Sequence, residues 1–288
     1  MKSRQCCARL RERRSVVMNP LTARQMWAQR SLFCFMLLMS GAIEAGEGLP
    51  KELAAKDGAA MVLVPAGEFW MGLPEGEGLD DEQPRHKVYL DAFYIDRFEV
   101  TTQQYAGFLA STGWEKPVNW DNVKFPEHAD RPVVGVNWSD ADAYCRMTAR
   151  RLPTEAEWER AARDENERKF PWGDARPKTS LALFGQMTQF SYDILKPVGS
   201  YPSGAGPYGT FDQAGNVAEW VQDWYDGEYY REGPERNPPG PAQGQYKMTR
   251  GGSWSDMPVY LLSASRTTKL PPGTRNGFIG FRCAQSAK

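Results

Sequence analysis

Glycine and proline are too frequent in this chain for long helices or long strands to dominate its fold. The 288 residues include 27 Gly and 21 Pro. Large aromatic side chains are also frequent, with 10 Trp, 12 Tyr and 13 Phe. Because glycine and proline favour turns and aromatic side chains bury large apolar areas, we expect a loop-rich fold held together by large side chains, and not a helical bundle.

The start of the chain differs in composition from the rest. The segment before residue 31 is rich in arginine, and the apolar segment 32–43 (LFCFMLLMSGAI) follows it, with the small residue Ala45 at its exit. This order is typical of a secretory signal. We therefore predict a signal peptide and leader over 1–45, a linker over 46–60 and one domain over 61–288, in a periplasmic or secreted protein. An uncleaved anchor or an internal start methionine fits the same pattern.

Removal of the leader changes the charge and the partners that we expect. Residues 1–45 hold eight of the 35 Lys/Arg and two of the 36 Asp/Glu, which leaves 27 basic and 34 acidic residues and a net charge of −7. This charge argues against nucleic acid as a partner. The apolar segment is shorter than the roughly 20 residues of a membrane span, so we expect no stable span after cleavage. We expect a monomer whose partner is a peptide, a protein or a small molecule.

Only Cys145 and Cys283 lie outside the leader. In an exported domain, two cysteines far apart in the sequence most simply form one disulfide bond. Two free thiols, one of them reactive, are the alternative.

Local patterns predict short elements of both kinds. Strands are expected from alternating or β-rich segments, and helices from capping residues. The expected elements are an opening strand or hairpin over 61–69, a strand over 87–95, a helix over 100–109 capped by Thr101 or Thr102, a helix from Ser139 to about Arg150, and a helix that begins at the capping box of Thr154 and Glu157.

A series of short motifs then occurs in one order along the chain. These are 64–72 (VPAGEFWMG), 98–105 (FEVTTQQY), 132–145 (PVVGVNWSDADAYC), 151–159 (RLPTEAEWE), 170–174 (FPWGD), 215–220 (GNVAEW), 250–254 (RGGSW) and 280–283 (GFRC). In this order they resemble the formylglycine-generating-enzyme, or sulfatase-modifying-factor, family. The resemblance implies an α+β fold with little regular secondary structure, a formylglycine-generating-enzyme-like variant of the C-type-lectin-like fold. It also implies that Cys145 and Cys283 form the structural disulfide of the family.

The residues that bind copper in that family are replaced here. Members of the oxidase branch convert a sulfatase cysteine to formylglycine with molecular oxygen, and two cysteines five positions apart bind the copper ion. The matching positions are Asp256 and Leu261. Soft Cu(I) prefers sulfur ligands, so we expect no copper site and no formylglycine generation. A three-histidine iron site is excluded too, because the chain has only His86 and His128.

Calcium is the metal that the resemblance supports. In the family, one calcium site is formed around the "GNxxEW" element, and its matching ligands here are the side chain of Asp212, the carbonyls of Gly215 and Val217, and the side chain of Glu219. Closely spaced hard oxygen atoms are what Ca²⁺ requires. The alternative is an Asx turn at Asp212 with a solvated Glu219. Ala218 stands where the family usually has a tryptophan near its active groove.

Two functions of different classes remain open at this level. The first is a periplasmic oxidoreductase or maturation factor, like the cysteine-lacking members needed to mature pyoverdine-type siderophores. Its pocket candidates are Arg250, Ser253, Asp256, Tyr260, Arg266 and Arg282, although structural clamps are the alternative for Arg250 and Arg282. The second is a non-catalytic, calcium-stabilised binding or accessory module of the cell envelope, for example a companion of a periplasmic copper nitrite reductase. Its contact surface is expected at 224–230 (WYDGEYY), whose aromatics pack into the core in the alternative interpretation.

Overall fold

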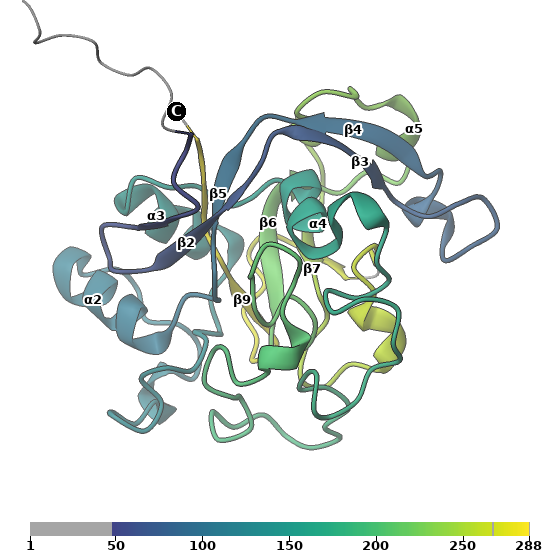
Figure 1. Ribbon diagram of the computed structural model, residues 1–288. Coiled ribbons are helices and arrows are strands. Elements are labelled where there is room, and N and C mark those ends of the chain that lie inside the picture. Colours follow the sequence, from purple (N-terminus) through teal and green to yellow (C-terminus); the bar gives the residue numbers. More distant parts are fainter. Residues whose placement is uncertain (1–47, 267, 288) are drawn as a thin grey trace, which may run out of the picture. The chain divides into compact units, whose positions relative to one another are not determined.

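The computed structural model describes residues 48–266 and 268–287. The predicted signal peptide and leader lie outside these residues. From Leu49 onwards the chain forms one unit in which short strands and helices alternate with long loops (Figure 1). No helix within the described ranges is long and apolar enough to cross a membrane.

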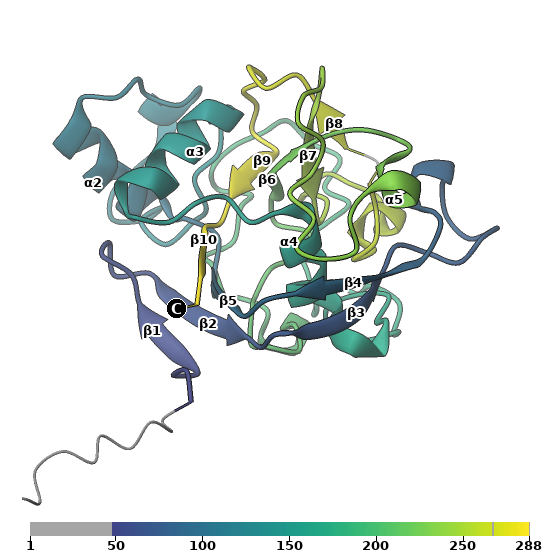
Figure 2. The same ribbon diagram turned by 90° about the horizontal axis from the view of Figure 1, so that it is seen from above.

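The strands form three small sheets. The first has the order β1–β2–β5–β10, with β1 (Glu52–Ala54), β2 (Ala60–Val64), β5 (Phe93–Asp96) and β10 (Ala284–Ser286), all antiparallel. The second pairs β3 (Gly67–Met71) with β4 (His86–Leu90). The third has the order β8–β7–β6–β9, with β8 (Lys269–Leu270), β7 (Lys247–Arg250), β6 (Ala218–Trp224) and β9 (Ile279–Phe281). Figure 2 shows β10, in yellow, beside β5, so the last strand of the chain completes the sheet that the first strands begin.

The helices are equally short. The α-helices are α2 (Thr102–Thr112), α3 (Trp138–Met147), α4 (Glu155–Arg163) and α5 (Tyr229–Glu232). The 3₁₀ turns are η1 (Asp80–Glu82), η2 (Trp120–Asn122), η3 (Asp164–Asn166), η4 (Pro202–Gly204) and η5 (Pro258–Leu261).

Two of the predicted helix starts are confirmed and one is corrected. Thr101 caps α2 and Thr154 caps α4, each by accepting a hydrogen bond from the backbone N–H three residues later. The cap of α3 is Asn137 and not Ser139, because the Asn137 side chain accepts from the Asp140 N–H at 2.9 Å and the Asp140 carboxylate accepts from the Asn137 N–H at 2.9 Å. This reciprocal box starts the helix two residues earlier than a cap at Ser139 would.

The predicted strands are divided differently in the structure. The segment 61–69 does not form a hairpin, because β2 pairs with β5 and β3 pairs with β4. The ladder runs from Val64↔Phe93 to Gly67↔Leu90, and it is interrupted where Pro65 has no N–H to donate. One predicted strand over 87–95 therefore becomes two strands in two sheets. The segment 46–60 contributes strand β1 to the first sheet.

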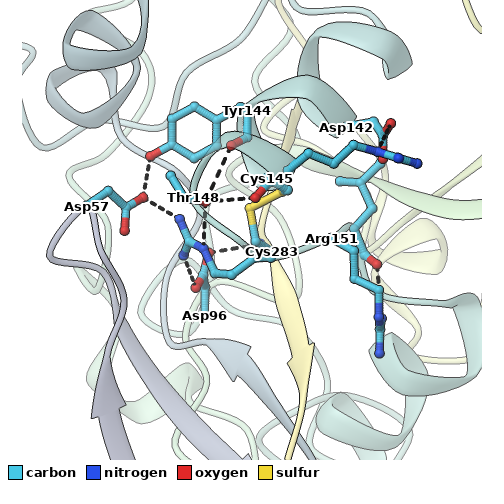
Figure 3. The surroundings of a disulfide bond; sticks show 11 residues. Asp57, Asp96, Asp142, Tyr144, Cys145, Thr148, Arg151 and Cys283 are labelled. Atoms are coloured by element: carbon cyan, nitrogen blue, oxygen red, sulfur yellow. Dashed lines mark hydrogen bonds and ion pairs between the residues drawn. A yellow bond between two sulfur atoms is a disulfide. The ribbon is translucent and has the colours of Figure 1, made fainter. Parts of the chain in front are cut away.

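The predicted disulfide is confirmed. It joins Cys145 on α3 to Cys283, directly before β10, and both residues are fully buried. Figure 3 shows this bond between α3 and the strands, with Tyr144 on one side bonded to Asp57. Arg150, which follows α3, forms ion pairs with both Asp57 and Asp96. The bond and these ion pairs hold α3 against the first sheet.

Replacement of both cysteines by serine should lower the free energy of unfolding. The bond closes a loop across a sequence separation of 138 residues, and loss of such a bond costs roughly 2–5 kcal/mol. Chemical denaturation of the parent and of the Cys145→Ser/Cys283→Ser variant measures the difference, with the parent in reductant as the control. Equal stability of parent and variant would contradict this role.

Candidate functional site

The two positions that match the copper ligands of the family serve local structure. The Asp256 carboxylate accepts hydrogen bonds from the backbone N–H and the hydroxyl of Ser253, each at 2.8 Å. Leu261 is fully buried in an apolar cluster with Phe170, Ala182 and Ala214. Tyr260 lies between them on η5 and is half-buried. The loop is thus closed by its own hydrogen bonds and anchored by an apolar side chain.

The three arginines expected along a pocket lie in the interior instead. Arg250 and Arg282 are at most 1% exposed, and Arg266 is fully buried. Arg250 donates to Glu155 at 2.6 Å and to Glu159 at 2.7 Å. For Arg250 and Arg282 the structure therefore matches the alternative interpretation as clamps.

Helix α4 is the reason why Arg250 and Arg266 are inside. All nine of its residues are buried, including Glu155, Glu157 and Glu159. A buried carboxylate must be paired and hydrogen-bonded, because an uncompensated charge in the interior costs several kcal/mol. Arg266 supplies a second cation, since it donates from Nε to Glu155 at 2.9 Å. Its Nη1 also donates to the carbonyl of Asp81 at 2.6 Å.

The aromatic segment 224–230 packs mostly inward. Tyr230 is 4% exposed and lies over Arg266, with 4.2 Å between the guanidinium carbon and the ring centre. Tyr225 donates its hydroxyl proton to Asp81 at 2.8 Å. The core-packing alternative therefore holds for Tyr230, whereas Trp224, Tyr225 and Tyr229 are half-buried.

A cavity lies next to η5. Leu262 and Ala264, just after η5, line a cavity of about 360 Å³ together with Leu73, Arg85 and Lys169. The sequence did not predict this cavity, because its walls come from four separate segments.

The expected calcium ligands are close to one another in the sequence but differ in their bonding. Asp212 is 6% exposed, has a left-handed backbone with φ of 57°, and accepts from the Gly199 N–H at 2.6 Å. Glu219 is fully buried and accepts from Arg282 at 2.6 and 2.7 Å and from the Trp158 indole at 2.8 Å. Glu219 is thus neither solvated nor free of partners.

Glu99 is a further buried carboxylate that lies against the turn containing Asp212 and Glu219. The motif spacing did not point to it. It is 1% exposed, and one carboxylate oxygen accepts from the Asn216 amide at 3.0 Å. Burial and the nearby Asp212 raise the pKa of Glu99 well above its usual value. Burial, with a further contribution from Glu219, raises the pKa of Asp212 to about 6. In residues 48–266 and 268–287, no three acidic, histidine or cysteine side chains converge as a metal site by themselves, so calcium here would need backbone carbonyls.

Two further buried groups have shifted pKa values. Burial, and next the negative charge of Glu155, raise the pKa of Asp223 to about 8. Burial lowers the pKa of Lys247 to about 8, and its ammonium lies 3.9 Å and 4.1 Å from the ring centres of Trp138 and Trp224. Cation–π contact on both sides places this lysine in the packing between α3 and β6.

The protein is a disulfide-bonded α+β scaffold with few regular elements, in which buried arginine–carboxylate pairs join distant segments of the chain. The chain belongs to the family described as "Sulfatase-modifying factor enzyme 1-like domain", which matches residues 46–287. The fold class and the family expected from the motifs are thereby confirmed.

Similar proteins carry several different names. The chain is 36% identical to the serine/threonine-protein kinase pkn1 of Chlamydia caviae over 247 residues, which cover 79% of this chain and 38% of that protein. It is 34% identical to the formylglycine-generating enzyme of Streptomyces coelicolor over 78% of this chain and 89% of that protein. The structure of PvdO from Pseudomonas aeruginosa matches with a TM-score of 0.66 and 27% identity, over 84% of this chain and 100% of that chain. The chain spans about two fifths of the length of the pkn1 protein.

The raised pKa of Asp223 predicts how stability depends on pH. Its folded-state pKa of about 8 lies above the usual value of about 4, so between these values the folded protein binds a proton that the unfolded chain releases. This contribution to stability therefore falls as pH rises from about 4 to about 8. Asp223→Asn should remove that part of the slope and be more stable than the parent at pH 8. Urea denaturation of both proteins at several pH values measures it, and parallel pH profiles would contradict the assignment.

Proposed function

We propose that this chain is an exported, monomeric binding or accessory module of the cell envelope, which keeps the scaffold of its family without the copper chemistry. The proposal rests on the structural roles of the side chains at positions 256 and 261. Asp256 closes a turn with Ser253, and Leu261 fills an apolar cluster. Neither side chain offers the sulfur ligand that Cu(I) prefers.

The exposed side of the same loop supports a role in recognition. Met257 and Val259 are 60% and 55% exposed, and Met187 is 98% exposed. The segment of Met187 is tied to the loop, because the N–H groups of Gly185 and Gln186 donate to carbonyls of residues 256 and 254, each at 2.9 Å. Exposed apolar side chains on loops of a rigid scaffold favour contact with another protein or peptide.

The chemistry of the chain also supports export. The basic start and the apolar segment 32–43 are typical of a secretory signal, and the buried bond between Cys145 and Cys283 is typical of oxidising compartments. A periplasmic copper nitrite reductase is an example of a partner for such an accessory module.

A second candidate function is a periplasmic oxidoreductase or maturation factor. The similarity to PvdO, which extends over the whole of that chain, favours it. A stoichiometric transition metal in the purified protein, with oxygen uptake in the presence of a phenol or a thiol, would support this candidate over the binding module. Calcium alone and no oxygen uptake would support the module.

We also propose that the fold is stabilised by calcium at the turn that contains Asp212, Gly215, Val217 and Glu219. Asp212 is an anionic oxygen ligand in a left-handed turn, and oxygen-rich turns suit Ca²⁺. Three buried carboxylates, those of Glu99, Asp212 and Glu219, lie at or beside this turn, and their negative charge supports a cation there. When bound, the ion would act as a structural cross-link and not as part of a reaction.

The proposal that copper chemistry is absent has a direct test. The purified exported form should not compete for Cu(I) with a chromophoric chelator, and it should leave the cysteine of a sulfatase-derived peptide unchanged in mass spectrometry. The Asp256→Cys/Leu261→Cys variant is the matched control, because it restores two thiols at the family positions. Tight copper binding by the parent together with conversion of the peptide cysteine to an aldehyde would overturn the proposal.

Removal of calcium should lower the melting temperature. An ion present at about 100 times its Kd stabilises by about 2.7 kcal/mol, which corresponds to roughly 5–10 °C for a domain of this size. Calorimetry with and without a chelator measures the shift, and re-addition of Mg²⁺ tests selectivity. Asp212→Asn, which tolerates the left-handed backbone, should show a smaller response. Identical melting curves in calcium and in chelator would argue against the site.

A further inference from the structure

The cavity beside the end of α4 combines cationic side chains with an apolar wall. Its volume of about 360 Å³ lies within the range of small-molecule sites. The cationic side chains that line it exceed the anionic ones by two. The cations are Arg85, Arg163, Arg168 and Lys169, the anions are Glu77 and Glu167, and the apolar residues are Leu73, Pro74, Leu262 and Ala264.

One of the four cations has no counter-ion in the protein. The other three have carboxylate partners at 2.6–3.1 Å, in the pairs Arg85–Glu167, Arg163–Glu159 and Arg168–Asp164. Lys169 is exposed, and its ammonium forms no ion pair or hydrogen bond within residues 48–266 and 268–287. The charge of this lysine is therefore available to a ligand in the cavity.

Backbone hydrogen bonds hold Lys169 beside the apolar wall. Its N–H donates to the Asp174 carboxylate at 3.1 Å, and its carbonyl accepts from the Ser263 N–H at 2.8 Å. Ser263 lies between Leu262 and Ala264, the two apolar residues that the segment after η5 contributes to the wall. The positive charge and the apolar surface thus belong to two segments that are fixed to each other.

Arg163 adds unused hydrogen-bond donors to the same wall. It is 3% exposed, and its Nη1 donates to the Glu159 carboxylate at 2.8 Å and to the Gly72 carbonyl at 2.9 Å. Its Nη2 makes one long contact, of 3.4 Å, with the Glu167 carbonyl, and its Nε has no acceptor in the described part of the chain. Nε and Nη2 form one edge of the guanidinium, and carboxylates bind arginine through two parallel hydrogen bonds of this kind.

We propose that this cavity binds a small organic anion that has one carboxylate and an apolar body. The carboxylate pairs with Lys169 and Arg163, and the apolar body packs against Leu73 and Leu262. The two glutamates of the wall repel a second negative charge on the ligand, and the apolar residues favour an organic acid over inorganic phosphate. The inference does not rest on the function proposed above, because neither positions 256 and 261 nor the turn assigned to calcium line the cavity.

Titration of the purified exported form with 4-phenylbutyrate, followed by methyl NMR, tests the proposal. The acid should shift the methyl signals of Leu73 and Leu262. The uncharged 4-phenylbutyramide should bind about tenfold more weakly, because charge-assisted hydrogen bonds are lost, and inorganic phosphate should also bind more weakly than the acid. Equal affinities of acid and amide, tighter binding of phosphate, or no shift of these two leucines would overturn the inference.

Variants of the unpaired lysine test its role. Lys169→Met keeps the apolar stem and removes the charge at an exposed position, so it should fold normally and weaken binding of 4-phenylbutyrate about fivefold. Lys169→Arg keeps the charge and should bind like the parent. Lys56→Met is the matched control, because Lys56 is exposed and does not line the cavity. Unchanged affinity in Lys169→Met, or equal losses in both methionine variants, would contradict the inference.

A free organic acid and the C-terminal residue of a peptide offer the same chemistry, and a second pair of probes separates them. The probes are acetyl-Ala-Ala-Phe with a free carboxylate and the same peptide with a C-terminal amide. Binding of the free-acid peptide as tightly as 4-phenylbutyrate, with loss on amidation, would support the inference and identify the ligand as the end of a partner chain. Binding of 4-phenylbutyrate alone would support it with a free acid as the ligand.

Discussion

The buried ion pairs of α4 are the interaction on which the rest of the structure depends. The helix lies with all nine residues in the interior, and its Glu155 and Glu159 are compensated by Arg250 of strand β7. Loss of one partner in a buried pair costs about 3–5 kcal/mol, since the other charge remains buried. A helix from the middle of the chain is therefore fixed to a strand near its end. A second pair, Glu219 with Arg282, joins β6 to the chain end in the same way.

These pairs explain why the motifs occur as a set. The glutamates of the "RLPTEAEWE" motif pair with the arginine of "RGGSW", and the glutamate of "GNVAEW" pairs with the arginine of "GFRC". Each motif taken alone would bury a charge without a partner. The family could be identified from their order, but the reason why the motifs occur together is visible only in the fold.

Local chemistry was predictable from the sequence, and long-range pairing was not. The caps Thr101 and Thr154 follow from residues three positions apart, and the disulfide follows from a count of two cysteines. The start of α3 was misplaced because Asn137 and Ser139 both have capping side chains, and only the fold selects Asn137. The roles of Arg250 and Glu99 depend on partners far away in the sequence: Glu99 and Asn216 are 117 residues apart. Sequence patterns relate residues only a few positions apart, so they could not predict these contacts.

The position of the altered loop explains how the family chemistry can be absent while the fold persists. The Asp256 carboxylate bonds within its own turn, to Ser253, and Leu261 contributes apolar packing. The disulfide and the buried ion pairs lie in other elements. A thiolate pair at these positions would serve a metal and not the scaffold, so its replacement by a turn residue and an apolar residue removes no contact on which the core relies. The same loop carries exposed side chains such as Met257, which are the ones that the proposed contact with a partner would use.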